Sequence, residues 1–150
     1  MGQYHLTVNL DKREFVHPHK LASGLKLWEQ LACEIGPGKA LIVLLAHPER
    51  RGGGDLDTSS ELAQRTIGRW RGDRIAIIGD YAENGDLPNK QPGDLPASEI
   101  YSAGWLDITD DVCAVIEHEL QGKFTGEGWR DFRRDGDEDQ RPDMVLEIEA

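Results

Sequence analysis

Two histidines stand two residues apart in the segment His17-Pro18-His19, and a proline bends the chain between them. Neutral imidazole is a common metal ligand, so both rings could face one zinc ion. A zinc site needs at least a third ligand, and nothing in the sequence brings an aspartate such as Asp73 or Asp80 close to the pair. The alternative is that one histidine caps the helix that follows while the other is solvated.

A second candidate site is the run Arg50-Arg51-Gly52-Gly53-Gly54-Asp55. Glycines such as Gly53 and Gly54 let backbone N–H groups converge on an anion, and the Arg51 guanidinium can fork onto a phosphate. The run is not a Walker loop, because no Gly-Lys-Ser/Thr follows it, and it lacks the GxGxxG pattern of a dinucleotide site. The sequence favours the alternative, a surface connection without a ligand.

The densest group of unusual residues surrounds Trp70, which stands between Arg69 and Arg71 just before an apolar run. An indole with cationic flanks offers a platform for a base or another planar ligand. Three charged residues at the two ends of the apolar run complete this candidate ligand site: Asp73, Arg74 and Asp80. The alternative places Trp70 in the core and pairs the arginines with the abundant acidic side chains.

Other motifs for metal binding or nucleophilic catalysis are incomplete or absent. Aspartates over 135–139 imitate the start of a calcium loop, but Gln140 replaces the turn glycine and Leu146 the bidentate glutamate. No GxSxG motif occurs, and neither Cys33 nor Cys113 has an evident activating partner. The sequence therefore supports no nucleophilic catalysis and leaves any cofactor unknown.

The length and charge of the chain limit the number of domains and the kinds of partner to be expected. Its 150 residues fit one domain spanning 1–150, and the formal net charge is −11. Residues 101–150 hold fourteen acidic and five basic side chains. This excess of negative charge argues against direct binding to nucleic acid or anionic membrane and suits a basic protein partner. A requirement for solubility alone also explains the charge. Two isolated cysteines, no leader sequence and no run long enough to span a bilayer predict a cytoplasmic protein.

The first third of the chain predicts a hairpin followed by a helix. Alternating apolar residues predict a strand over 4–8, and after a polar break at Asp11 and Lys12 the chain can return as a second strand over 13–16. A helical stripe then predicts a helix over 23–34 with one buried face. The apolar residues of this stripe are Leu21, Leu25, Trp28, Ala32 and Ile35.

The remainder predicts helices, one strand and two irregular segments. We expect a buried helix over 39–47 and a central strand over 74–79. A capping box at Thr58 and Glu61 predicts a helix to about Ile67. The further expected elements are an irregular Pro-rich segment over 84–104, a helix capped by Thr109 and ending at Gly122, an acidic loop over 131–143 and a closing strand over 144–148. The expected fold is α+β, a small and mainly antiparallel sheet with about three helices packed on one face.

Short segments spread over a little more than half of the chain resemble one protein family. They are MGQY (1–4), NLDK (9–12), HPHK (17–20), GLKL (24–27), GGGD (52–55), GRWRGDR (68–74) and GDYA (79–82), with a fainter match over 105–109. The family comprises small bacterial and phage proteins for which no activity is established. The resemblance implies a bacterial or phage origin and carries no catalytic residues across.

Two functional hypotheses follow. The first is a small, acidic, cytoplasmic binding protein with a basic partner, motivated by the charge and by the lack of a recognisable nucleophile, metal set or cofactor motif. The alternative is a small enzyme or ligand-binding domain for a phosphorylated or nucleotide-like compound. In that case Arg51, Trp70, Arg71 and Arg74 would bind the ligand, and His17 or His19 would act as acid–base or metal ligand. The alternative requires these residues to converge on one cleft.

Overall fold

The structure, a computed structural model, describes residues 2–33 and 35–120 and has an α+β fold. Four strands form one mixed sheet in the order β3-β1-β2-β4. Their bounds are His5–Asn9 for β1, Glu14–Val16 for β2, Ile75–Gly79 for β3 and Leu106–Asp107 for β4. Pairing is antiparallel except between β2 and β4, so the predicted, mainly antiparallel sheet is confirmed.

The predicted hairpin is present as β1 and β2, and Asn9 determines its turn. The buried Asn9 side chain accepts hydrogen bonds from the backbone N–H groups of Asp11 and Lys12, at 2.9 and 2.7 Å. This Asx turn brings Asn9 opposite Glu14 in the antiparallel register. Arg13 follows in a left-handed conformation, with φ of 56°.

Among the strands of the described residues, β3 lies at an edge of the sheet, whereas a central strand was predicted. It pairs with β1 over the register His5 to Gly79 through Asn9 to Ile75. An uninterrupted apolar run usually indicates a strand covered on both sides. Here Ile78 is buried while Ile77, at 53% exposure, faces solvent.

Helices in the first half of the described chain differ from prediction. Of the helix expected over 23–34, the structure forms the short helix α1 (Leu27–Ala32), and the 3-10 helix η1 (Pro18–Leu21) and a break at Ala22 in a left-handed conformation precede it. Helix α2 (Gly36–Leu45) confirms the buried helix expected over 39–47 but begins earlier. The break moves Leu21 into the core and leaves α1 with no buried residue.

The cap of helix α3 (Glu61–Thr66) lies two residues after the predicted cap. Asp57 accepts a hydrogen bond from the Ser59 backbone N–H at 3.0 Å and fixes the chain before the helix. Ser60 therefore supplies the cap, because its hydroxyl accepts from the Ala63 N–H at 3.1 Å. Hydrogen bonds from Ser59, together with the nearby His118 ring, lower the pKa of Asp57 to about 2.

The helix expected from Thr109 is α5 (Thr109–Leu120), and the expected apolar stripe does face the core. Thr109 is the first residue of α5 and not its cap, and its hydroxyl accepts from the His17 N–H at 2.7 Å and so ties α5 to the end of β2. The irregular segment 84–104 contains the 3-10 helix η2 (Asn84–Asp86) and helix α4 (Ala97–Ile100). The predicted end of the helix at Gly122, the acidic loop and the closing strand lie outside the described residues.

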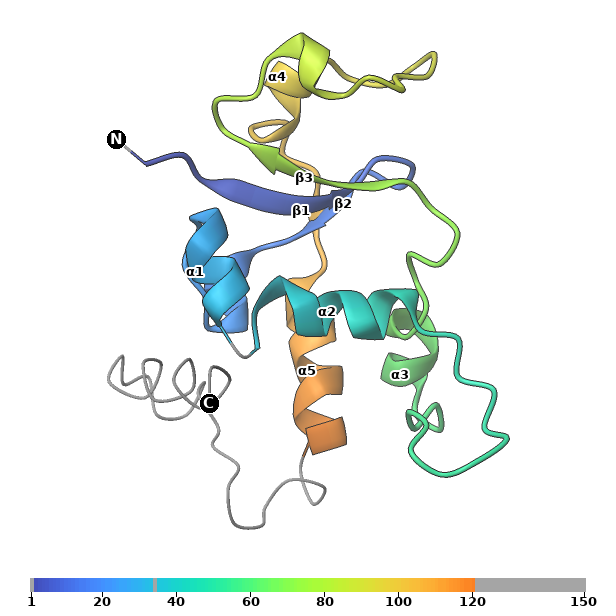
Figure 1. Cartoon of the computed structure of the whole chain (residues 1–150). Coiled ribbons are helices and arrows are strands. Elements are labelled where there is room, and N and C mark those ends of the chain that lie inside the picture. The colour runs from blue at the N-terminus through green and yellow to red at the C-terminus, as the bar shows by residue number, and fades with distance from the viewer. Residues whose placement is uncertain (1, 34, 121–150) are drawn as a thin grey trace.

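Two hydrophobic clusters cover the two faces of the sheet. The larger one joins β2 to α2, α3 and α5 and includes Val16, Leu44 and Trp70. The smaller one joins β1 and β3 to α4 through Leu6 and Ile100. Figure 1 shows this arrangement, with α4 on one side of the sheet and α2, α3 and α5 on the other. Within the described ranges, no helix is long and apolar enough to cross a membrane.

Candidate functional site

Trp70 lies in the larger core cluster and is fully buried. Its indole N–H donates to the Glu14 Oε1 at 2.9 Å, and Glu14 is itself 3% exposed. The Arg69 Nε lies 3.0 Å from both carboxylate oxygens of Glu14, which raises the pKa of Arg69. The core alternative for Trp70 therefore holds, and the indole presents no open face to a planar ligand.

The glycine loop stands apart from the other candidates. A Cβ added to Gly53 or Gly54 would meet nothing within 4 Å, so this backbone is open to solvent. Arg51 pairs with its neighbour Glu49 at 2.6 Å. Arg71 contacts the His47 ring at the C-terminal end of α2 instead of joining the loop in an anion site.

The remaining candidate ligand residues occupy opposite ends of β3. Before the strand, Asp73 accepts from Asn9 at 2.8 Å and from Lys12, and these contacts, led by Lys12, lower the pKa of Asp73. After the strand, Asp80 accepts from the Tyr4 backbone N–H at 2.9 Å. A strand rises about 3.3 Å per residue, which separates Asp73 from Asp80 by roughly 20 Å.

Arg74, also before β3, is held by two carboxylates. Its guanidinium binds Asp94 at 2.8 and 3.0 Å and Asp11 at 2.8 Å. These contacts, led by Asp94, raise the pKa of Arg74, and Arg74 in turn lowers the pKa of Asp94. The pair fastens the Pro-rich segment to the sheet, which is a structural role for Arg74.

His17 and His19 act as the helix-cap alternative describes. The His17 Nδ1 accepts from the His19 backbone N–H at 3.2 Å and so caps η1. The rings lie 5.2 Å apart between centroids, and burial, followed by the charge of His19, lowers the pKa of His17. In the described part of the chain, no group of three or more His, Cys, Asp or Glu side chains is placed to hold a metal ion.

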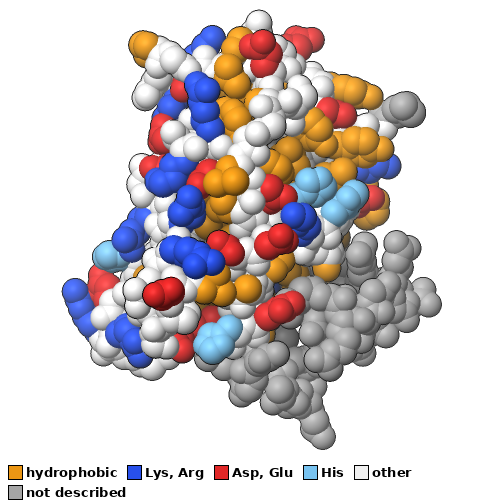
Figure 2. All heavy atoms as spheres, turned by 180° about the vertical axis from the view of Figure 1, so that it is seen from behind, with side chains coloured by type: hydrophobic (Ala, Val, Ile, Leu, Met, Phe, Trp, Pro, Cys, Tyr) orange, Lys and Arg blue, Asp and Glu red, His pale blue; other side chains and the backbone are white. Residues whose placement is uncertain are grey.

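The candidate residues thus belong to separate hydrogen-bond and ion-pair groups and do not converge on one cleft. Figure 2 shows charged side chains of both signs side by side on one face of the molecule, with hydrophobic side chains among them. Such a mixed surface lacks the single-sign field that would concentrate a phosphorylated ligand.

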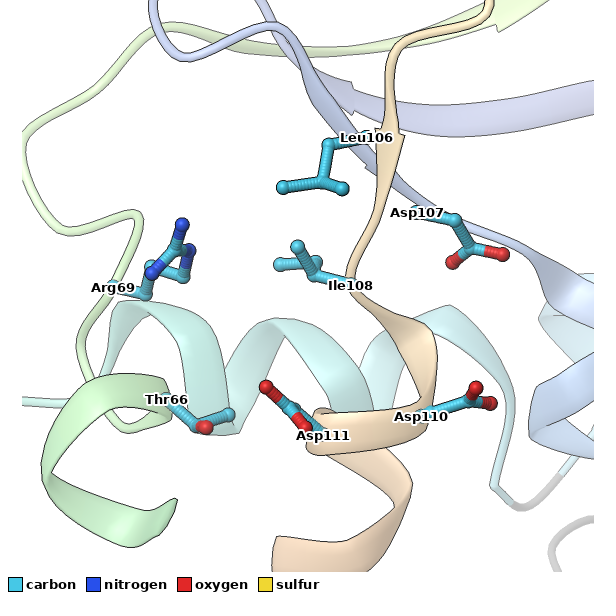
Figure 3. A pocket seen from close by; sticks show the side chains of 7 residues that line it. All are labelled: Thr66, Arg69, Leu106, Asp107, Ile108, Asp110 and Asp111. Carbon is cyan, nitrogen blue, oxygen red and sulfur yellow. The ribbon is translucent and has the colours of Figure 1, made fainter. Parts of the chain in front are cut away.

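Sequence analysis did not single out a hollow between α3, β4 and α5. Its volume is about 300 Å³, and its lining residues are Thr66, Arg69, Leu106, Asp107, Ile108, Asp110 and Asp111. Figure 3 shows Asp111 on the side of Arg69, whereas Asp107 and Asp110 point to the other side of the chain. There Lys20 pairs with Asp107 and Asp110, at 3.0 and 3.5 Å. Asp111 pairs instead with Arg65 at 3.3 Å, so the carboxylates are held by two different cations and the hollow holds no convergent acid–base pair.

The most unusual surface is the exposed side of α1. Trp28 is 68% exposed and Leu31 is 89% exposed, and Leu27 is exposed beside them. We call these three side chains the α1 apolar face. The helix is fixed by Gln30, whose side-chain amide donates to the backbone carbonyls of His5 and Leu25, at 3.1 and 2.9 Å.

Periodicity assigned Trp28 to the core and was wrong. The break at Ala22 separates Leu21 from α1, and the polar contacts of Gln30 set the orientation of the helix. The sequence nevertheless indicated that these side chains share one side of a helix, because Leu27 and Leu31 recur four residues apart beside Trp28.

Comparisons with models of protein families, with curated proteins and with solved structures gave no match. The surfaces and sites of this α+β chain therefore carry the functional argument by themselves.

Proposed function

We propose that this chain is a small acidic binding protein that engages a basic protein partner through the α1 apolar face. The observation that carries the proposal is α1 itself, a helix with no buried residue that presents Leu27, Trp28 and Leu31 to solvent. Contiguous exposed apolar side chains mark interaction surfaces in soluble proteins, and Trp is enriched among the residues that dominate binding energy.

The charge of the chain supports a basic partner. The formal net charge is −11, and 101–150 carries most of the excess. A net negative charge attracts a basic partner and raises the association rate. The apolar face would then supply the short-range energy, since full burial of one large apolar side chain contributes about 1.5–3 kcal/mol. The resemblance noted above supports a bacterial or phage protein, and we place it in the cytoplasm.

The test compares matched surface variants in affinity capture followed by calorimetry with the captured protein. Trp28→Ser removes the centre of the α1 apolar face, whereas Ile42→Ser removes an apolar side chain of similar exposure, 63%, from α2. We expect Trp28→Ser to weaken binding by about 2 kcal/mol or more, about thirtyfold in Kd, and Ile42→Ser to bind as the native protein does.

Salt dependence tests the charge component of the same proposal. Raising the ionic strength should slow association with a basic partner, because exposed charges are screened. An association rate that does not change with ionic strength would contradict the proposal. So would a Trp28→Ser variant that binds as tightly as the native protein.

The alternative, a small enzyme or ligand-binding domain for a phosphorylated or nucleotide-like compound, has less support. Its candidate residues are spread over the core, an open loop and both ends of β3. A thermal-shift screen against nucleotides, phosphorylated metabolites and divalent metals tests it directly. A ligand at 100 times its Kd would add about 2.7 kcal/mol to stability, and a clear rise in melting temperature would favour the alternative.

A further inference from the structure

We propose that a second hollow, between η1, α1 and the start of β1, binds a free α-amino acid with an apolar side chain. The proposal concerns a different surface from the α1 apolar face and does not depend on the basic partner. The volume of this hollow is about 590 Å³, within the range of roughly 300–1,000 Å³ that small-molecule sites occupy. Its lining includes Tyr4, His19, Leu25, Lys26 and Glu29.

The backbone around this hollow is held by the sheet and by α1. The Leu25 carbonyl accepts from the His5 N–H and from the Gln30 side-chain amide, both at 2.9 Å, which fastens the loop before α1 to the start of β1. The Tyr4 carbonyl accepts from the Asp80 N–H at 2.9 Å. Figure 1 shows α1 close to the N-terminal half of β1. A ligand therefore meets a preformed backbone, which lowers the entropic cost of binding.

Lys26 and Glu29 bring opposite charges to the hollow without neutralising each other. Such residues, three apart on a helical turn, commonly pair. Among the described residues, however, neither the Lys26 ammonium nor the Glu29 carboxylate takes part in an ion pair. The Glu29 Oε2 accepts from the Lys26 backbone N–H at 3.1 Å. The carboxylate is thus fixed by the backbone, while its charge is left for a ligand.

Two glycines give these charged side chains their positions. A Cβ added to Gly24 would overlap with the Glu29 carboxylate, so this carboxylate occupies the space that a side chain at Gly24 would take. A Cβ added to Gly2 would come within 2.5 Å of the Lys26 Cε. The two charged side chains therefore lie along the backbone of different segments, which keeps the ammonium and the carboxylate apart.

This arrangement of charges selects a zwitterion. A phosphate or another anion would be attracted by Lys26 and repelled by Glu29, and for a simple amine the two effects are reversed. An α-amino acid carries an ammonium and a carboxylate on one carbon, so each protein charge meets a favourable partner at a hydrogen-bond distance of about 2.7–2.9 Å. The Leu25 side chain and the Tyr4 ring, which is 42% exposed, offer apolar contacts to the side chain of the ligand.

The first experiment titrates the full chain with L-leucine and follows the backbone amide resonances by NMR. We expect saturable shifts at Gly24, Leu25 and Lys26, with a Kd of about 1 mM or lower for a ligand of this size. Leucinamide lacks the carboxylate and N-acetyl-leucine lacks the ammonium, so each should bind about tenfold more weakly. Resonances that do not respond to leucine, or equal binding of either analogue, would overturn the proposal.

Two variants assign the charges of the ligand to their partners. Glu29→Gln keeps an oxygen for the Lys26 N–H and loses the charge, so it should weaken leucine binding about tenfold without weakening N-acetyl-leucine. Lys26→Met should weaken leucine binding to a similar degree without weakening leucinamide. The matched control is Glu61→Gln, which neutralises the acid in the first turn of α3 as Glu29→Gln does in α1. Leucine binding that persists in both site variants, or falls equally in Glu61→Gln, would reject this site.

The two proposals fail separately. Trp28 does not line this hollow, so Trp28→Ser should bind leucine as the native chain does. Leucine binding that is lost in Trp28→Ser and kept in Glu29→Gln would place the ligand on the α1 apolar face and overturn the hollow as its site.

Discussion

Because the carboxylate of Glu14 is buried, we predict that losing its partner Arg69 destabilises the protein more than neutralising Glu14 itself. Glu14 accepts from the Trp70 indole at 2.9 Å and from Arg69, and its side chain is 4% exposed while that of Arg69 is 34% exposed. Removal of Arg69 leaves a negative charge in the core, with the indole as its remaining described partner. Neutralisation of Glu14 leaves a cation that can turn toward water.

Arg69→Leu should therefore destabilise the protein more than Glu14→Gln. Removing one partner of a fully buried ion pair costs about 3–5 kcal/mol. We take about 3 kcal/mol for Arg69→Leu, the lower end, because water reaches the arginine side and screens the pair. Glu14→Gln keeps an oxygen acceptor for the indole and loses only the charge-assisted hydrogen bonds, which corresponds to about 1–2 kcal/mol.

The assay is urea unfolding of the two single variants and the double variant, followed by circular dichroism and extrapolated linearly to water. The double variant should be less destabilised than the sum of the single variants, because glutamine leaves no buried charge after the arginine is lost. Equal losses in the single variants, or strict additivity in the double variant, would refute the argument. A changed slope with denaturant would instead indicate an altered unfolded or native state.

Three further predictions concern local structure. Gly68→Ala should cost about 1–3 kcal/mol in urea unfolding, because Gly68 has φ of +77° and a Cβ there would lie 2.8 Å from a backbone oxygen, whereas Gly53→Ala should change stability by less than about 0.5 kcal/mol. In the same assay, Ser60→Ala should lower the free energy of unfolding by about 1 kcal/mol and Thr58→Ala by clearly less, because Ser60 is the cap of α3. The reverse order would support the predicted capping box at Thr58 instead. The pKa of Asp57 in the folded protein, about 2, lies below its ordinary value of 3.8, so its contribution to stability is present above pH 3.8 and is lost as the pH falls toward 2. Acid titration of the melting temperature should therefore be flatter for Asp57→Asn in that range than for the native chain, and parallel curves would argue against the contact.

Local sequence determined much of the fold. The alternation in 4–8, the short return over 13–16 and the turn residue Asn9 specify the hairpin, because strand period and Asx-turn chemistry act over a few residues. The apolar stripe after Thr109 specifies α5 for the same reason. The His17 cap was among the sequence alternatives, since it needs a partner only two residues away.

The tertiary structure decided what depends on distant partners. An apolar run cannot show whether β3 is central or at an edge, because that depends on whether another strand lies beside it. The sequence likewise could not place Trp70 and Trp28. Trp70 is buried because Glu14, 56 residues away along the chain, accepts its N–H, and Trp28 is exposed because Gln30 holds α1 through His5 and Leu25. Pattern and turn chemistry are local, whereas the burial of one indole and the exposure of another depend on contacts that form only when distant segments pack together.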